Sequence, residues 1–115
     1  MGTQFKENSL SKRISESRYI ISKYPDRIPI IVGRHPECKW PDIDKFKYIV
    51  PKDMQLSQFI FYIRKRIKLE STQTLFVTIN NSLFSGSKTI GDIYEEEPNE
   101  DGFLYLLYTN ENTFG

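Results

Sequence analysis

The side chains able to do acid–base, nucleophilic or metal chemistry are few in this sequence of 115 residues. His35 is the only histidine and Cys38 the only cysteine, and they stand three positions apart. A zinc site needs further ligands of these types, and a cysteine nucleophile needs a base held by a third group. The sequence offers neither, so we interpret His35 and Cys38 as exposed loop residues. We expect no metal, no cofactor and no enzymatic activity.

Two segments suit binding or covalent attachment better than catalysis. Residues 45–51 (KFKYIVP) alternate lysines with apolar side chains, which is typical of an edge strand whose lysines discourage indiscriminate pairing. Such an edge can accept one extended peptide as an added strand, and a plain half-buried edge is the alternative. Residues 109–115 are polar and finish in Gly115. A glycine carboxylate is unhindered toward a nucleophile, as a conjugated modifier requires, although a glycine here equally fits an arbitrary chain end.

The composition is that of one folded domain with an uneven charge distribution. Residues 1–68 carry fifteen Lys and Arg against seven acids (+8), and residues 69–115 carry one against eight (−7). This asymmetry indicates either a basic face for an acidic partner or two halves that pair in the fold. Nucleic-acid binding is a minor alternative that we do not favour, because Trp40 is the only aromatic ring outside the expected core. The single cysteine and the lack of a long apolar run favour an intracellular protein, neither exported nor integral to a membrane.

Hydrophobic periodicity predicts three helices and four strands. The clearest helix has Leu56, Phe59, Ile60, Ile63 and Ile67 on one face, the spacing of a 3.6-residue period. The expected elements are a helix over 9–24, strands over 27–33 and 45–50, a helix over 55–68, a strand over 74–80, a short helix over 90–95 and a central strand over 103–109. Pro29 lacks an amide hydrogen, so its strand must tolerate one missing bond. This order is that of the ubiquitin-like β-grasp, an α+β fold.

Several motifs, in order along nearly the whole chain, resemble a known family. They are KYPDRIPIIV (23–32), KYIVP (47–51), QFIFYIRKRI (58–67), LFVTIN (75–80), IGDIYEE (90–96), EDGFLYLLY (100–108) and the aromatic-Gly ending. The sequence resembles the autophagy-related ubiquitin-like modifiers, the family of GABARAP and the microtubule-associated-protein light-chain modifiers, and is most similar to the GABARAP branch in the first and third motifs.

The resemblance implies a ubiquitin-like β-grasp with two additional N-terminal helices. We expect a single domain over 1–115, with a helical extension at 1–24, the core at 25–108 and a flexible conjugation tail at 109–115.

The resemblance also implies two pockets that bind partner peptides of the form aromatic-x-x-aliphatic. The positions that match the aromatic pocket are Glu16, Ile20, Pro29, Ile31, Lys47, Ile49 and Phe103. Those that match the aliphatic pocket are Tyr48, Val50, Pro51, Met54, Phe59, Tyr62 and Ile63, and those of a basic rim are Arg27 and Arg66. Met54 and Tyr62 stand where leucine is commoner, and Phe46 replaces a usual lysine, so pocket preference and the basic clamp on acidic peptide residues should differ.

The function implied by the resemblance is that of an autophagy modifier. Gly115 would be conjugated to phosphatidylethanolamine by activating and conjugating enzymes, with a cysteine protease for processing and delipidation. The pockets would recruit cargo receptors and adaptors, and the protein would divide between the cytoplasm and autophagosomal or other vesicle membranes. The alternatives are a modifier of protein lysines, which the same glycine chemistry permits, and a peptide-binding trafficking adaptor that is not conjugated.

Overall fold

The structure, a computed structural model, describes residues 2–110. The elements in chain order are η1 (Gly2–Glu7, a 3-10 helix), α1 (Leu10–Lys23), β1 (Arg27–Arg34), β2 (Lys47–Pro51), α2 (Leu56–Arg66), β3 (Phe76–Ile79), α3 (Ile90–Glu96) and β4 (Leu104–Thr109). Each element expected from the sequence is present, with ends that differ by up to two residues, and η1 with α1 supplies the two N-terminal helices. The ubiquitin-like fold is therefore confirmed.

The four strands form one mixed sheet in the order β2-β1-β4-β3. β1 is antiparallel to β2 and parallel to β4, and β3 is antiparallel to β4. The apolar β4 is central, as its composition predicts, and β2 lies at an edge, as Lys45 and Lys47 predict. Pro29 faces Ile49 across β2, and the pairing of β1 with β4 begins only at Ile30, so the missing amide hydrogen interrupts neither ladder.

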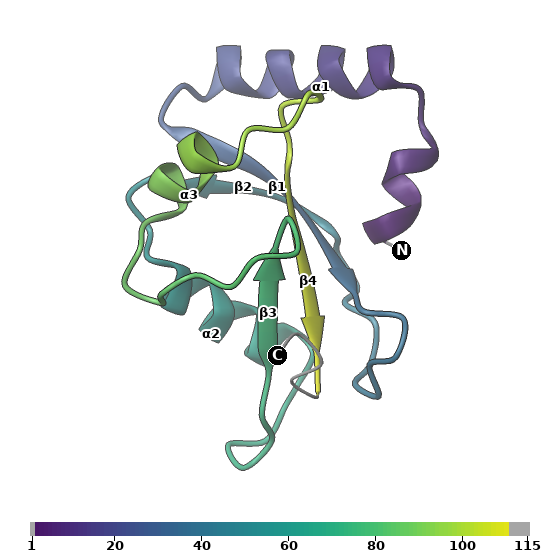
Figure 1. The fold of residues 1–115 in the computed structure, drawn as a ribbon, viewed down its shortest axis with the longest axis vertical. Coiled ribbons are helices and arrows are strands. Elements are labelled where there is room, and N and C mark those ends of the chain that lie inside the picture. The colour runs from purple at the N-terminus through teal and green to yellow at the C-terminus, as the bar shows by residue number, and fades with distance from the viewer. Residues whose placement is uncertain (1, 111–115) are drawn as a thin grey trace.

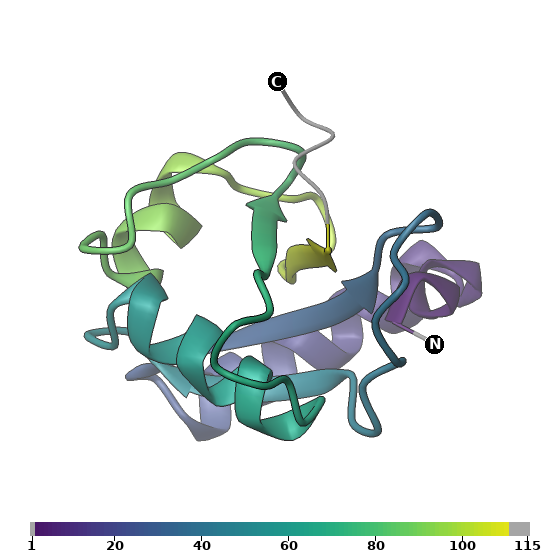
Figure 2. The ribbon, with the colours of Figure 1, turned by 90° about the horizontal axis from the view of Figure 1, so that it is seen from below.

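The main core lies between the sheet and the two helices α2 and α3, which cover one of its faces (Figures 1 and 2). Phe59 and Ile63 of α2 and Ile90 and Ile93 of α3 are buried there. They meet the side chains of alternate sheet residues, among them Ile28, Ile30, Val32, Val77, Ile79, Leu104, Leu106 and Tyr108. The apolar residues that recur with a 3.6-residue period on α2 and with a two-residue period on the strands therefore meet in one core.

The opposite face of the sheet is covered in part by η1 and α1. Phe5 and Ile20 form a smaller buried cluster with Ile31 and Phe103. Ser9 caps the N-terminus of α1: its hydroxyl accepts a hydrogen bond from the amide of Lys12 at 3.3 Å. The helix ends at Lys23, two residues before Pro25.

A buried carboxylate ties α1 to the start of β4. Arg13 Nη1 donates to Asp101 Oδ2 at 2.8 Å, and the Tyr105 hydroxyl donates to the same oxygen. Asp101 Oδ1 accepts from the amide of Phe103 at 3.0 Å, and the Asp101 carbonyl accepts from the Ser17 hydroxyl at 2.6 Å. The helix is thereby fixed to the sheet by polar contacts as well as by Ile20.

Two expectations about the loop before β2 are wrong. Cys38 is only 6% exposed and belongs to the main core, and His35 is partly buried, so neither is an exposed loop residue. Trp40 is half-buried against the same core, and its indole N–H donates to the carbonyl of Thr74 at 2.9 Å. The loop folds back over the sheet end, a long-range contact that loop composition does not indicate. Trp40 is therefore no free base-stacking ring.

Buried tyrosines predict a loss of stability in alkali. Burial raises the pKa of Tyr48 and of Tyr105 to about 12, and raises the pKa of Tyr108 as well. In the unfolded chain these phenols ionise near pH 10, so above that pH the unfolded state loses protons first. We expect the free energy of unfolding to hold up to about pH 10 and to fall from there to about pH 12.

Urea unfolding at a series of pH values measures this decline, and Tyr48→Phe provides the control. The Tyr48 hydroxyl is buried with no hydrogen-bond partner among the described residues, so its removal should cost little at pH 7 and should reduce the alkaline decline. If the free energy of unfolding finished falling below pH 9, or if its fall were unchanged by Tyr48→Phe, ionisation of the buried tyrosines would not be the cause.

Candidate functional site

The outer edge of β2 presents backbone groups that can pair with another strand. The amide of Val32 donates to the carbonyl of Phe46 at 2.7 Å, and the amide of Lys52 donates to the carbonyl of Asp26 at 3.0 Å. Hydrogen-bonded pairs alternate along an antiparallel ladder, so Lys47 and Ile49 belong to the non-bonded pairs. Their N–H and C=O groups point away from β1, toward solvent.

β2 also divides the two predicted pockets. Because side chains alternate along a strand, Lys47 and Ile49 lie on the side of η1 and α1, and Tyr48 and Val50 lie on the side of α2. The two residue sets assigned from the resemblance therefore flank one extended edge. A peptide paired with β2 would direct alternate side chains to the two sides.

The positions of the expected aromatic pocket lie together beside α1. Ile20, Ile31 and Phe103 are buried in one cluster, with Ile49 packed against it. Pro29 lies opposite Ile49 in the sheet. Glu16 Oε1 and Lys47 Nζ form an ion pair at the rim, and both side chains are about one third exposed (35% and 33%). Lys47 therefore already has an acidic partner.

Phe5 is a residue of this site that the sequence analysis missed, and Phe46, noted there only as the replacement of a usual lysine, packs against the same cluster. The Phe5 ring lies edge-on to Phe103, with the centroids 4.9 Å apart, and 6.3 Å from the ring of Phe46. Lys47 Nζ lies 5.1 Å from the centroid of Phe5. Phe5 is the one large apolar side chain among residues 2–9, which is the signal that could have placed it over the cluster.

The positions of the expected aliphatic pocket are mostly core residues. Tyr48, Val50, Phe59 and Ile63 are buried in the main core, and Met54 packs against it. Tyr62 is 40% exposed, and its ring centroid lies 5.7 Å from that of Tyr48 and 6.4 Å from that of Phe59. Pro51 is partly buried. Pro51, Met54 and Tyr62 therefore supply the accessible surface of this set, and its buried members lie beneath them.

The two basic rim residues differ in how far they are engaged. Arg66 makes a two-point contact with the Asp44 carboxylate at 2.9 and 3.1 Å and donates to the Tyr62 hydroxyl at 3.0 Å. These bonds raise the pKa of Arg66 and lower the pKa of Asp44. Arg27 is exposed and reaches the carbonyl of Ile49 at 3.4 Å. Arg27 is therefore the rim cation more open to a partner's acid.

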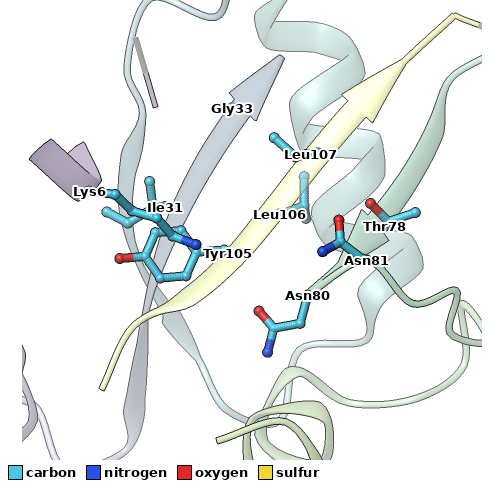
Figure 3. A pocket seen from close by; sticks show the side chains of 9 residues that line it. All are labelled: Lys6, Ile31, Gly33, Thr78, Asn80, Asn81, Tyr105, Leu106 and Leu107. Atoms are coloured by element: carbon cyan, nitrogen blue, oxygen red, sulfur yellow. The ribbon is translucent and has the colours of Figure 1, made fainter. Parts of the chain in front are cut away.

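A hollow separate from the predicted peptide site lies on the sheet face that η1 and α1 leave partly uncovered (Figure 3). It has a volume of about 120 Å³, with Lys6 and Tyr105 on one side and Asn80 and Asn81 on the other. Thr78 is buried beside them, and its hydroxyl has no hydrogen-bond partner in the described chain. No residue expected for the peptide site except Ile31 lines this hollow.

Gly115, the expected conjugation residue, lies outside the described residues. The described chain reaches Asn110, whose side-chain oxygen accepts a hydrogen bond from the amide of Lys39 at 2.7 Å. Thr109 pairs with Phe76 at the start of β3. The chain therefore leaves the sheet at a fixed point between the loop before β2 and the first residue of β3.

Neither a metal cluster nor a spanning helix is found in the described part of the chain. No group of three or more His, Cys, Asp or Glu side chains there could hold a metal ion. None of the helices over residues 2–110 combines the length and apolarity needed to cross a membrane.

The mixed sheet, the helix α2 across one face and the free edge of β2 define a ubiquitin-like protein. The family model described as "Autophagy protein Atg8 ubiquitin like" matches residues 12–115, and the chain belongs to this Atg8 family. Autophagy-related protein 8a of Arabidopsis thaliana is 50% identical over 108 residues, 94% of this chain and 88% of its own. Autophagy-related protein 8e of the same plant is 45% identical over 115 residues, 99% and 94% of the two chains.

A solved structure gives the same result. The crystal structure of Trypanosoma brucei ATG8 superimposes with a TM-score of 0.85 at 36% identity, covering 94% of this chain and 93% of that one. Members of the family are ubiquitin-like modifiers, not enzymes, and this applies to the present chain. These matches establish the Atg8 family as a whole and do not distinguish the GABARAP branch, so the finer assignment stays a prediction.

Proposed function

We propose that this protein is an autophagy modifier that recruits receptors and adaptors through β2 and is conjugated through Gly115 to phosphatidylethanolamine. The observation that carries the recruiting role is the exposed edge of β2, with outward backbone groups flanked by two sets of apolar side chains. We use the term β2 groove for the outer edge of β2 together with the residues of the two predicted pockets on either side of it.

An aromatic-x-x-aliphatic peptide fits the β2 groove as an added strand. Its aromatic residue would lie over Ile49 and the cluster beneath it, and its aliphatic residue over Pro51, Met54 and Tyr62. Each buried anchor should contribute roughly 1.5–3 kcal/mol. The contact is small, so we expect affinity near micromolar, about −8 kcal/mol.

Conjugation to the lipid would attach the protein, and with it the β2 groove, to a membrane. The Gly115 carboxylate would react with ATP to form an adenylate and release pyrophosphate. An enzyme cysteine thiol would then displace AMP to form a thioester, and the lipid amine would displace that thiol to form the amide. The amide carries two acyl chains, and two chains anchor a protein stably where one does not. The proposed partners are thus the activating and conjugating enzymes, the processing protease, and cargo receptors displayed on autophagosomal membranes.

The groove is tested by titrating an aromatic-x-x-aliphatic peptide into the protein and following amide NMR shifts. We expect the shifts to concentrate at residues 16–31, at 47–63 and at 103, with a dissociation constant near micromolar. Replacing both anchors of the peptide by alanine should abolish them. Shifts confined to other residues, such as those around the hollow of Figure 3, would contradict the proposed groove.

The Glu16–Lys47 ion pair predicts an effect of acidic residues beside the peptide core. A peptide acid must compete with Glu16 for Lys47, so Glu16→Gln should strengthen binding of an acid-flanked peptide by roughly two- to fivefold. The gain should shrink with added salt, because these are rim charges. Calorimetric titration measures it, with Glu95→Gln as the control that removes an equal charge from exposed α3. An equal gain for a peptide without acids would rule out this explanation.

A further inference from the structure

The outer face of α2 carries an exposed aromatic ring among cations. Phe61 is 58% exposed, and Lys65 Nζ lies 4.6 Å from its centroid. Arg64 and Leu69 line the same surface hollow. Phe59 and Ile63 of the same helix point into the core, whereas Phe61 and Lys65 are exposed; Leu69, at the margin of this face, packs against the core.

The cations of this face are not neutralised within the described residues. None of Arg64, Lys65 and Lys68 is in an ion pair there, and Arg64 donates to the backbone carbonyl of Glu70, not to its carboxylate. Arg66, one turn from Tyr62, is by contrast held by Asp44. We call Phe61, Arg64, Lys65, Lys68 and Leu69 the α2 outer patch: four of them line one hollow, and the exposed Lys68 directly precedes Leu69 after the end of the helix. With Glu70 as the neighbouring acid, the patch is positively charged.

The patch lies at the end of the molecule where the chain leads to Gly115. Its hollow is also lined by Thr74 and Leu75, which directly precede Phe76, the partner of Thr109 in the sheet. In Figure 1 the start of β3, the end of β4 and α2 lie toward the lower end, and α1 lies at the top. Asn110, the last described residue, directly follows Thr109, and the five residues after it span at most about 18 Å.

We propose that the α2 outer patch rests on an anionic lipid surface when Gly115 is joined to a lipid, an inference that rests on the proposed conjugation. Phe61 would enter the boundary between headgroups and acyl chains, where proteins bound at a membrane surface bury Trp, Phe and Leu side chains. Arg64, Lys65 and Lys68 would lie near lipid phosphates and serine carboxylates, which attract basic residues close to a membrane. The outward groups of Lys47 and Ile49 lie on the sheet edge, not on this helix face, so the groove stays open to partners.

The orientation can be tested without any conjugating enzyme. A Gly115→Cys variant of the full chain is coupled to a maleimide-bearing phospholipid in nanodiscs of phosphatidylcholine with phosphatidylserine; Cys38 is buried and stays unlabelled. A spin label on the lipid headgroups broadens amide signals near the surface. We expect broadening to concentrate at residues 61–69, and to weaken in discs without phosphatidylserine.

Matched variants distinguish a specific effect of the α2 outer patch from an effect that any exposed pair of an aromatic residue and a lysine would have. Tyr19 and Lys23 on α1 have the same spacing as Phe61 and Lys65; Tyr19 is 62% exposed, and Lys23 Nζ lies 5.7 Å from its ring. Phe61→Ala with Lys65→Gln should remove the broadening at 61–69, and Tyr19→Ala with Lys23→Gln should leave it unchanged. All four side chains are exposed, so both variants should keep the parent's spectrum in solution.

A second measurement uses the unattached chain. Binding to phosphatidylserine vesicles should fall about 25-fold in Lys65→Gln/Lys68→Gln, since each cation near such a surface is worth roughly fivefold. Broadening centred on α1, or equal effects of the two variant pairs, would overturn the orientation. Because the lipid is attached chemically, a failure of enzymatic conjugation would count against the proposed function and not against this surface.

Discussion

Replacing Arg13 with methionine should lower the free energy of unfolding by about 3 kcal/mol, because removal of one partner of a buried ion pair leaves an uncompensated charge. Asp101 is buried, and Arg13 is its only cationic partner in the described chain. The amide of Phe103 and the Tyr105 hydroxyl would still donate to the carboxylate, which keeps the expected loss at the lower end of the range for such pairs.

Urea unfolding of both proteins measures the loss. Arg18→Met, at an exposed position of the same helix, is the matched control and should change stability by less than about 0.5 kcal/mol. Asp101→Asn added to Arg13→Met removes the stranded charge and should recover part of the loss. Equal losses for Arg13→Met and Arg18→Met would show that the network contributes no stability.

Gly115→Ala should abolish the lipid conjugate that the protein forms with activating and conjugating enzymes, ATP and phosphatidylethanolamine liposomes. The physical reason is steric, because a methyl group beside the carbonyl hinders attack at the adenylate and at each thioester. The intact mass of the product is the measurement. We expect a lipid-sized increase for the parent chain and none for the variant.

Asn112→Ala is the control for this experiment. If the residues that follow Asn110 provide reach and no recognition, this variant should still give the lipid adduct. A protein-sized adduct would favour attachment to a lysine, and no adduct with enzymes that are active on another modifier would favour the unconjugated adaptor.

The local elements could be predicted from the sequence because each has its own pattern. The period of Leu56, Phe59 and Ile63 indicates which side of α2 is buried, and the lysines at 45 and 47 indicate that β2 is an edge strand. The position of Pro29 opposite Ile49 could not be inferred from either strand alone, because it depends on the register between them. The ubiquitin-like order of elements was therefore predictable, and the alignment of the two strands at the groove required the structure.

The side chains of the site were predictable only where the resemblance supplied them. The cluster of Ile20, Ile31 and Phe103 draws on segments of the chain far apart in sequence, and no local pattern brings them together. Phe5, Cys38 and Trp40 were misjudged or missed for the same reason, since each is buried by a contact with a distant segment. Asp101 resembles an ordinary surface acid in sequence, but in the fold it is buried among Arg13, Tyr105 and the amide of Phe103.

The parallel pairing of β1 with β4 has a consequence for the order in which the protein is made. Ile30 pairs with Leu104, so β1 cannot acquire its inner neighbour until most of the chain has been synthesised. Contacts so distant in sequence slow folding, and until they form the apolar β1 stays open to aggregation and to chaperones. A chain interrupted before residue 104 has no central strand to hold the sheet together. The groove at β2 is therefore displayed only by polypeptides whose synthesis has passed β4.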